Sequence, residues 1–352
     1  MKKLMKVAQL KGIKKIELEE LPKPSVGENE ILLKIKACSI CGSDVRTYNF
    51  GHDRVKLPAV IGHEISGVVE QVGSGVTKFQ TRDRVCLGAD VPSMEDDWSQ
   101  NGMGNLSDIN YAIGHQFPGG FAEYCLLNET TVKFGPLAKI PDDISYEEAC
   151  LTEPLACCVN GLERCFMEPC KTVLVMGAGP IGIMLAQLAE AFGASKVVIS
   201  EMDEKRIEQA RGLGFKNVVN AEEGNLETVK NDLTNGKGFD VILTACPSVE
   251  AHKQSVNLIS KRGVINFFGG LPAGSKEVSF LSNAIHYKEA YITGSHGATP
   301  RHFKLALDLI VNKRIDVKSL VTHKFPLEKI GEAFETAQSL SGLKVLILPT
   351  GK

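Results

Sequence analysis

The chain has 352 residues, of which 43% are apolar and 23% are charged, and its 40 basic and 42 acidic residues give a formal net charge of −2. This composition excludes a disordered or collagen-like chain. The near-neutral charge argues against nucleic acid or an anionic membrane surface as a partner. The length suits two domains or one large α/β unit.

The amino end and the cysteines bear on location. Apolar residues in the segment 1–15 are interrupted too often for a secretory signal, and no run of about 18 apolar residues predicts a transmembrane helix. The ten cysteines follow no repeating spacing, so reduced thiols are expected rather than disulfides. We therefore expect a cytoplasmic protein in which some cysteines bind metal.

The predicted elements change in type near residue 150. Before that point, β-rich runs such as 30–36 and 65–72 are separated by Gly, Pro and Asp, which indicates a barrel-like half of many strands and turns. After it, apolar strands alternate with long helical stretches, the pattern of parallel βαβ units. The strands are expected at 171–176, 196–200, 218–219, 239–243, 264–268 and 291–293, and the helices at 180–192 and 203–213.

These strands suffice for a six-stranded, doubly wound sheet. From about residue 294 onward, the sequence predicts a helix at 301–311 and a last strand at 344–348, and we expect this tail to return to the first domain. The predicted organisation is a β-rich domain formed by residues 1–152 and 295–352, and an α/β dinucleotide-binding domain at 153–294.

A glycine-rich turn follows the strand at 171–176. The pattern G-x-G-x-x-G is met by Gly177, Ala178, Gly179, Pro180, Ile181 and Gly182, between an apolar strand and an apolar helix. The first glycine permits a tight turn, the second lets the backbone approach a pyrophosphate, and the third lets the helix pack on the strand. The amino end of the helix then faces the phosphate charge. The alternative interpretation is a plain strand-to-helix turn.

The next strand ends on an acidic residue, Glu201, which follows Gly177 by 201 − 177 = 24 positions. A carboxylate at this place suits the ribose 2′-hydroxyl of NAD. Arg206 lies close behind and suits the 2′-phosphate of NADP, so NAD is favoured and NADP stays open. Thr244 and Gly269, which follow two later strands, are further candidate cofactor contacts.

Three places in the chain offer metal ligands. These are Cys41, the pair His63 and Glu64, and Glu153. Thiolate, imidazole and carboxylate together suit a tetrahedral zinc, and a catalytic zinc keeps one position for water or substrate. Taken singly, Cys41 also suits a buried apolar position and His63 a hydrogen-bonded turn. The spacing alone leaves both interpretations open.

Longer segments around these residues resemble the zinc-containing medium-chain alcohol dehydrogenases. The matching segments, in the order of that family, are 22–28, 30–44, 62–76, 119–124, 153–156 and the glycine-rich turn at 177–182. Together they span nearly the whole chain. The resemblance implies a GroES-like catalytic domain and a Rossmann coenzyme domain.

Within that family, a glutamate rather than a cysteine at position 153 is similar to sorbitol and related polyol dehydrogenases. The resemblance implies one catalytic zinc held by Cys41, His63 and Glu64. It implies that Glu153 is either a direct ligand or bonded to the zinc water.

The same resemblance assigns catalytic roles to Ser43, Asp44 and Glu64. Asp44 is expected to orient His63 by accepting its free ring N–H, and Ser43 to relay the alcohol proton. The alternative interpretations are a turn carboxylate and a helix-capping serine. The expected reaction is reversible hydride transfer between a secondary alcohol and NAD in a cleft where zinc acts as a Lewis acid.

Many relatives carry a structural zinc held by four cysteines. At the matching intervals this chain has Ser93, Asp96, Ser99 and Ser107. Hydroxyls are poor zinc donors and one carboxylate does not replace four sulfurs, so we expect no structural zinc. Residues 91–110 are then expected to form a polar loop that is mobile or makes an altered subunit contact.

The substrate is less legible. Candidate contacts are Arg46, Tyr48, His52 and His296, with solvated loop positions as the alternative. The polyol dehydrogenases that this chain resembles usually carry an arginine soon after the position of Gly294, whereas the first arginine here is Arg301. This departure weakens free sorbitol as substrate, and Arg46, Arg301 and His296 suit a phosphate. A sugar-alcohol phosphate is therefore the alternative to a free polyol.

Two other classes share the expected fold. One is a zinc-free NADPH-dependent quinone or enone reductase, and the other is a noncatalytic nucleotide-binding relative. The combination of Cys41, His63 and Glu64 argues against the first, and the presence of Ser43 beside those ligands argues against the second. The expected partners are a small polyol or polyol phosphate and, through the bare edge of the Rossmann sheet, further copies in a homodimer or homotetramer.

Overall fold

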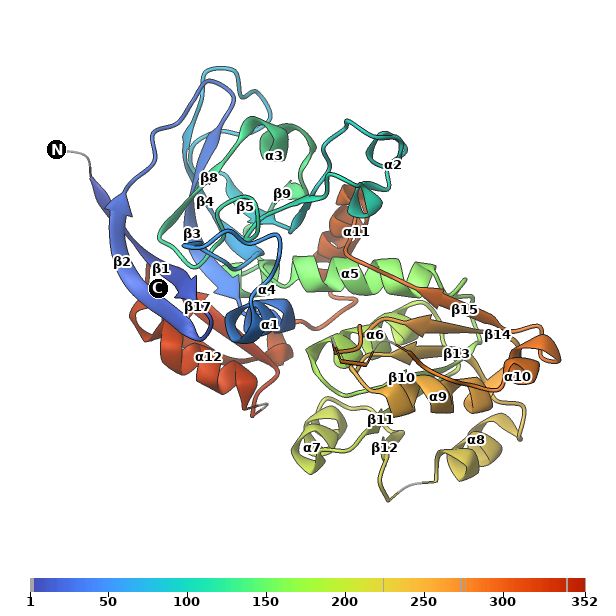
Figure 1. Cartoon of the computed structure of the whole chain (residues 1–352). Helices are drawn as coiled ribbons and strands as arrows, with labels where there is room; N and C mark the ends of the chain where they lie inside the picture. Colours follow the sequence, from blue (N-terminus) through green and yellow to red (C-terminus); the bar gives the residue numbers. More distant parts are fainter. Residues whose placement is uncertain (1–2, 224, 273, 276, 340, 352) are drawn as a thin grey trace. The chain divides into compact units, whose positions relative to one another are not determined.

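The computed structural model describes residues 3–223, 225–272, 274–275, 277–339 and 341–351 (Figure 1). The chain forms two compact units. The first comprises Met1–Ala156 and Gly297–Lys352, and the second comprises Cys157–His296. Across the described residues, no helix has the length and apolar character needed to cross a membrane.

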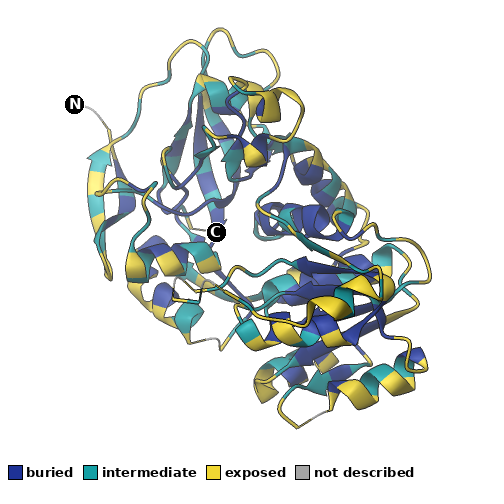
Figure 2. Cartoon of the chain, turned by 45° about the vertical axis from the view of Figure 1, so that its right-hand side comes forward, coloured by how far each residue is buried: buried dark blue, intermediate teal, exposed yellow. Residues whose placement is uncertain are grey.

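The first unit is built on a seven-stranded sheet in the order β16-β17-β3-β4-β5-β9, with β8 paired to β3. Its strands are β3 (Ile31–Ser39), β4 (Glu64–Val72), β5 (Arg84–Leu87), β8 (Tyr124–Leu127), β9 (Leu137–Lys139), β16 (Val321–Pro326) and β17 (Lys344–Leu348). Two smaller antiparallel pairs are β1 (Leu4–Gly12) with β2 (Lys15–Pro22), and β6 (Asp90–Val91) with β7 (Tyr111–Ala112). Buried residues concentrate on the strands of the sheet (Figure 2).

Short helices connect these strands. They are α1 (Gly42–Phe50), α2 (Asp97–Gln100), α3 (Glu129–Phe134), α4 (Tyr146–Ala149), α11 (Pro300–Val311) and α12 (Ile330–Gln338), with 3-10 turns η1 (Gly104–Leu106), η2 (Lys318–Leu320) and η3 (Leu327–Lys329). The ring of Phe334 on α12 packs edge-on against the fully buried Phe121, with ring centroids 5.8 Å apart. This contact joins the carboxyl-terminal tail to the core of the first unit.

The register of three strands brings distant parts of the sequence together. β3 runs antiparallel to β4 with Ser39 opposite Glu64, and antiparallel to β17 with Ser39 opposite Leu346. The first residues of β4 and β17 therefore flank the end of β3, which lies two positions before Cys41. Lys344, the first residue of β17, reaches this place only because the tail pairs with the amino-terminal sheet.

The second unit carries the six-stranded parallel sheet that the sequence predicts. Its order is β12-β11-β10-β13-β14-β15, which is the doubly wound order with the chain reversing between β10 and β13. The strands are β10 (Thr172–Met176), β11 (Lys196–Glu201), β12 (Val218–Asn220), β13 (Phe239–Thr244), β14 (Ile259–Phe267) and β15 (Tyr291–Gly294). The helices are α6 (Pro180–Ala191), α7 (Glu204–Gly212), α8 (Leu226–Thr234), α9 (Val249–Leu258) and α10 (Ser282–His286). A further helix, α5 (Thr152–Glu163), runs from the first unit into the second.

One strand begins earlier than the sequence predicts. β14 starts at Ile259 rather than at 264, and its first half is irregular. Arg262 adopts a positive φ of 55°, and the register with β13 shifts between Phe239 and Val241. The charged and glycine residues at this irregularity interrupt the apolar run, which explains why the pattern shows only the second half of the strand.

The segment 91–110, predicted to be a polar loop, contains the short helix α2 and the 3-10 turn η1. Asp96 caps α2 by accepting the N–H of Ser99 at 2.8 Å, and its other carboxylate oxygen accepts the hydroxyl of Ser107. The Ser99 hydroxyl donates to the Asp96 carbonyl at 3.1 Å, and the Ser93 hydroxyl accepts the N–H of Glu95 at 3.2 Å. Three of the four positions considered for a structural zinc, Asp96, Ser99 and Ser107, therefore form a network of local hydrogen bonds centred on Asp96, and Ser93 bonds separately to Glu95.

Candidate functional site

Asp44 ties together the two segments that carry the predicted metal ligands. Cys41 is the N-cap of α1, and Asp44 is the third residue of that helix. Its Oδ2 accepts the N–H of Cys41 at 2.9 Å, which closes a capping box, and its Oδ1 accepts the N–H of Gly62 at 3.2 Å. With only 3% of its surface exposed, Asp44 fixes Cys41 relative to the segment that contains His63 and Glu64.

The three predicted ligands Cys41, His63 and Glu64 converge. One donor atom from each lies within 4.8 Å of the other two. His63 and Glu64 are buried, and Cys41 is half-buried. The Nδ1 of His63 lies 3.4 Å from Oδ1 of Asp44, and its Nε2 lies 3.5 Å from the hydroxyl of Ser43. The ring is therefore held between Asp44 on one nitrogen and Ser43 on the other.

The protonation of this group is set by its charges. Burial disfavours the imidazolium of His63, but the Asp44 carboxylate and the Cys41 side chain outweigh burial and hold the pKa of His63 well above its ordinary value. The Nδ1 of His63 faces the Asp44 carboxylate, which leaves Nε2 as the ring nitrogen for a metal. A metal bound there would replace a proton, and a converging thiol, imidazole and carboxylate form a donor set that fits zinc.

Glu64 has a partner that the sequence analysis missed. The Nζ of Lys344 lies 2.6 Å from both carboxylate oxygens of Glu64, and both residues are buried. Burial disfavours the ammonium, but the charge of Glu64 outweighs it and raises the pKa of Lys344 above its ordinary value. The sequence does show a lysine at the start of an otherwise apolar last strand. Its position in the sequence does not indicate that it pairs with Glu64.

Glu153 lies beside the cluster. It is the second residue of α5 and is buried. Burial, followed by the negative charges of Glu64 and Asp90, raises the pKa of Glu153 to about 7, although His63 and Lys344 oppose the shift. The three donor atoms within 4.8 Å of one another do not include one from Glu153.

Tyr48, a predicted substrate contact, is used in packing. Its hydroxyl donates to the carbonyl of Lys14 at 3.1 Å, and its ring lies 4.9 Å from that of Phe334. These contacts anchor α1 to the turn between β1 and β2 and to α12. The structure therefore gives the ring a clear structural role.

The other predicted substrate contacts lie at the surface. Arg46 and Arg301 are exposed on α1 and α11 of the first unit, and His296 is exposed at the end of the second unit. His52 is half-buried, and its ring contacts that of His115.

His115 is a second residue that the sequence analysis missed. Its ring lies 6.0 Å from that of His63 and 5.0 Å from that of His52, the latter in an edge-to-face arrangement. Burial lowers the pKa of His115 to about 4, and the positive charges of His63, Arg54 and His52 act in the same direction. No motif surrounds His115 in the sequence, so only the fold reveals its place beside His63, one of the predicted metal ligands.

In the second unit, the glycine-rich turn has the geometry that its sequence predicts. Gly177 has a positive φ of 114°, which disfavours a side chain. An added Cβ at Gly182 would stand 1.9 Å from the Gly177 carbonyl oxygen, so only glycine lets α6 approach β10 this closely. Gly179 is the N-cap of α6, and Pro180 with Ile181 opens its first turn. The turn leaves the amino end of α6 available for a phosphate.

Glu201 at the end of β11 lies against this turn. Its Oε2 accepts the N–H of Ala178 at 2.7 Å, and its Oε1 accepts the N–H of Met202 at 2.7 Å. The Nη1 of Arg206 lies 4.0 Å from Oε2 of Glu201, and Arg206 is also the nearest side chain to an added Cβ at Gly179. An acidic and a basic side chain therefore stand together beside the predicted dinucleotide site.

Thr244 and Gly269 lie at the carboxyl ends of the neighbouring strands. Thr244 is the last residue of β13, and its carbonyl accepts the N–H of Gly269 at 2.7 Å. An added Cβ at Gly269 would stand 2.8 Å from the carbonyl oxygen of Cys246. This edge, next to the point where the strand order reverses, is where ligands bind in doubly wound sheets.

Comparison with known proteins assigns the chain to a family. The alcohol dehydrogenase GroES-like domain matches residues 27–142, and the zinc-binding dehydrogenase domain matches residues 180–312. A sorbitol dehydrogenase from Halalkalibacterium halodurans is 30% identical over 351 residues, which cover 99% of this chain and 99% of that protein. The chain belongs to the zinc-containing medium-chain alcohol and polyol dehydrogenases. The protein is therefore an oxidoreductase.

Two further proteins are similar to this dehydrogenase over nearly its whole length. A D-arabitol-phosphate dehydrogenase from Enterococcus avium is 32% identical over 342 residues, which cover 96% of this chain and 95% of that protein. A crystal structure from Sinorhizobium meliloti with bound NADP has a TM-score of 0.88 and 26% identity, with 99% of this chain and 100% of that chain covered. The predicted fold class, GroES-like domain plus Rossmann domain, is confirmed, and the family uses zinc and a nicotinamide cofactor.

Proposed function

We propose that this dehydrogenase catalyses reversible hydride transfer between a secondary alcohol of a polyol and NAD, with a single catalytic zinc held by Cys41, His63 and Glu64. The observation that carries the proposal is the convergence of these three donors within 4.8 Å in a largely buried site. The relatives named for sorbitol and D-arabitol phosphate support a polyol-type substrate.

The residues around the proposed metal position have separate roles in the reaction. Zinc bound there supplies Lewis acidity that stabilises negative charge on the substrate oxygen. Asp44 holds the His63 ring and the Cys41 backbone in place through the contacts described above, so the donor set is pre-organised. Ser43, whose hydroxyl lies 3.5 Å from Nε2 of His63, is placed to accept the alcohol proton and pass it on.

Lys344 and Glu153 act on the proposed metal site through charge and hydrogen bonding. Lys344 balances the charge of Glu64, so this carboxylate is stable in the buried site before a metal binds. Glu153 stands next to the three donors, and we assign it a hydrogen bond to water or substrate at the open metal position rather than direct ligation.

The second unit would bind NAD, whose nicotinamide ring accepts the hydride. We propose that Glu201 binds the ribose 2′-hydroxyl of NAD, because its carboxylate already lies at the glycine-rich turn and bonds to the N–H of Ala178. A 2′-phosphate at this place would meet the charge of Glu201 at close range. Arg206 reduces that repulsion, so the proposed preference for NAD is one of degree.

We also propose that copies associate through β15, the edge strand of the parallel sheet. Tyr291 on this strand is 48% exposed and stacks edge-on with Phe166, which is 67% exposed. An apolar open edge favours pairing with a second copy. Sedimentation of the wild type and of Tyr291→Glu tests this, with a smaller species expected for the variant.

Assays of the zinc-loaded enzyme with polyols, polyol phosphates and simple secondary alcohols test the proposed reaction. We expect NAD reduction with a polyol or its phosphate, loss of turnover on chelation and recovery with added zinc. Full turnover by the metal-free enzyme would contradict the proposal.

A further inference from the structure

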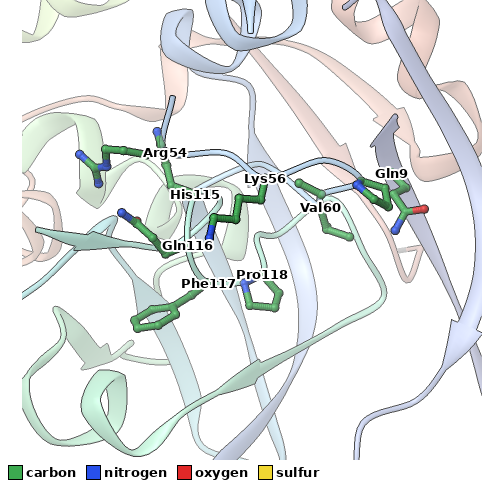
Figure 3. Close-up of a pocket in the computed structure, with 10 residues that line it drawn as sticks. Gln9, Arg54, Lys56, Val60, His115, Gln116, Phe117 and Pro118 are labelled. Carbon is green, nitrogen blue, oxygen red and sulfur yellow. The ribbon is translucent and has the colours of Figure 1, made fainter. Parts of the chain in front are cut away.

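A pocket of about 390 Å³ lies in the first unit, apart from the residues assigned to the metal (Figure 3). Its walls come from β1, from the segment 54–60 that leads into β4, and from the turn 115–118. Figure 3 shows Arg54, His115 and Gln116 together at one end of the pocket and Gln9 at the other.

The lining of this pocket is basic. Arg54 and Lys56 line it, and none of the described lining residues carries a carboxylate. The Nη2 of Arg54 donates to the carbonyl of Asn110 at 2.9 Å, while its buried Nε has no hydrogen-bond partner in the described structure. Asp53 lies next in sequence but is exposed and outside the lining. The pocket therefore concentrates positive charge without an internal counter-ion.

The walls are held by backbone hydrogen bonds. Leu10 and Ala59 exchange hydrogen bonds of 2.8 and 3.0 Å, which fix the segment 54–60 against β1. The N–H of Gly119 donates to the carbonyl of Val60 at 2.8 Å, and the N–H of Gly114 donates to the carbonyl of Phe117 at 2.9 Å. The basic side chains thus project from a pre-formed frame, which reduces the cost of ordering them around a ligand.

His115 connects this pocket with the metal site. It lines the pocket, and its ring lies 6.0 Å from the ring of His63. A small molecule with its hydroxyl at the metal position therefore has the pocket as a neighbouring space for its other end. Both places belong to the first unit.

We infer that this pocket binds the phosphate of a phosphorylated polyol whose secondary alcohol is oxidised at the metal site. The inference rests on the proposed function and makes its substrate class specific. An arginine and a lysine supply two permanent positive charges, which match the charge of a phosphate monoester better than that of a carboxylate. Arginine adds a planar fork of donors suited to phosphate oxygens.

Direct binding is tested first by titrating the zinc-loaded, cofactor-free enzyme with inorganic phosphate in a calorimeter at constant ionic strength. The double variant Arg54→Gln/Lys56→Gln is expected to bind phosphate about tenfold or more weakly than the wild type, as the loss of charge-assisted hydrogen bonds predicts. Lys78→Gln, which removes an exposed lysine elsewhere in the unit, is the matched control and should match the wild type. Equal binding by the wild type and the double variant overturns the inference.

Kinetics with D-arabitol and its terminal phosphate monoesters provide the second test. We expect the wild type to favour a phosphate ester by about tenfold or more in kcat/KM, and the double variant to lose most of that ratio through KM. A ratio near one in the wild type overturns the inference while the proposed function stands. Absence of turnover with every alcohol overturns the proposed function, and the phosphate titration still decides whether the pocket binds the anion. Arg54→Lys, which keeps the charge, should retain more of the ratio than Arg54→Gln, and thermal unfolding confirms that each variant is folded.

Discussion

The ammonium of Lys344 contacts both carboxylate oxygens of Glu64 at 2.6 Å, with 4% of the lysine and none of the glutamate exposed. The two residues begin the strands β4 and β17, which lie on either side of β3, so the ion pair spans the end of β3 near Cys41. The buried ion pair holds the Glu64 carboxylate in place. The carboxyl-terminal tail thus supports the proposed metal site.

Replacing Lys344 by methionine should destabilise the metal-free protein. The variant leaves the Glu64 carboxylate buried without a counter-charge, which costs about 3–5 kcal/mol in the free energy of unfolding. Urea denaturation at neutral pH measures this loss. The double variant Lys344→Met/Glu64→Gln removes both charges and should recover the larger part of it. A single variant within about 1 kcal/mol of the wild type would show that the ion pair is not important for stability.

Glu201 should set the choice of cofactor. The variant Glu201→Ala removes the carboxylate proposed to bind the ribose 2′-hydroxyl, while Arg206 remains to attract a 2′-phosphate. We expect the ratio of kcat/KM for NAD to that for NADP to fall by about 10- to 100-fold, the range for a hydrogen bond to a charged group. Glu204→Ala, on the exposed first turn of α7, is the control and should leave the ratio near that of the wild type. An unchanged ratio in Glu201→Ala would remove Glu201 from the cofactor site.

The segment 91–110 should depend on Asp96 rather than on a metal. In Asp96→Ala the hydrogen bonds from Ser99 and Ser107 are lost, and we expect proteolysis within the segment to become about tenfold faster. Asp97→Ala, an exposed neighbour, is the control. A chelator should change neither rate, and protection by added zinc would contradict this assignment.

The hydrogen bonds to Asp96 should make the stability of segment 91–110 depend on pH. The hydroxyl of Ser107, followed by the N–H of Ser99, holds the pKa of Asp96 below its ordinary value of 3.8. Because the folded-state pKa is lowered, the stabilisation is fully present above pH 3.8 and is lost as the pH falls through the lower, folded-state pKa. Amide exchange at Ser99, corrected for its intrinsic pH dependence, should show this loss in the wild type and not in Asp96→Asn.

The fold class and the glycine-rich turn could be predicted from the sequence because short-range sequence patterns determine them. The glycine-rich turn is predictable, since a strand, three spaced glycines and a helix admit few geometries, and Gly177 and Gly182 have the conformations that the spacing requires. The fold class follows from the alternation of strands and helices. Cys41 and His63 were identified by the resemblance of their flanking segments to a known family.

The partners of those residues could not be predicted in the same way. Lys344 lies 344 − 64 = 280 positions after Glu64, and only the pairing of β17 with β3 brings the two together. His115 reaches His63 through a turn that carries no motif. The sequence shows that segment 91–110 has no cysteines to hold a metal, and it therefore predicts a loop. It does not show the hydrogen bonds that Asp96 makes within the segment. Tertiary contacts decide each of these cases, and hydrophobic patterns do not record them.

The zinc content of the purified protein tests the central claim most directly. Elemental analysis after growth with added zinc should give about one zinc per chain for the wild type and for Cys170→Ala, which alters an exposed cysteine. Cys41→Ala should contain about a tenth of that amount or less, with its far-ultraviolet circular dichroism unchanged. A wild-type protein without zinc, or a Cys41→Ala protein that keeps the full amount, would contradict the assignment of Cys41, His63 and Glu64 as the catalytic metal site.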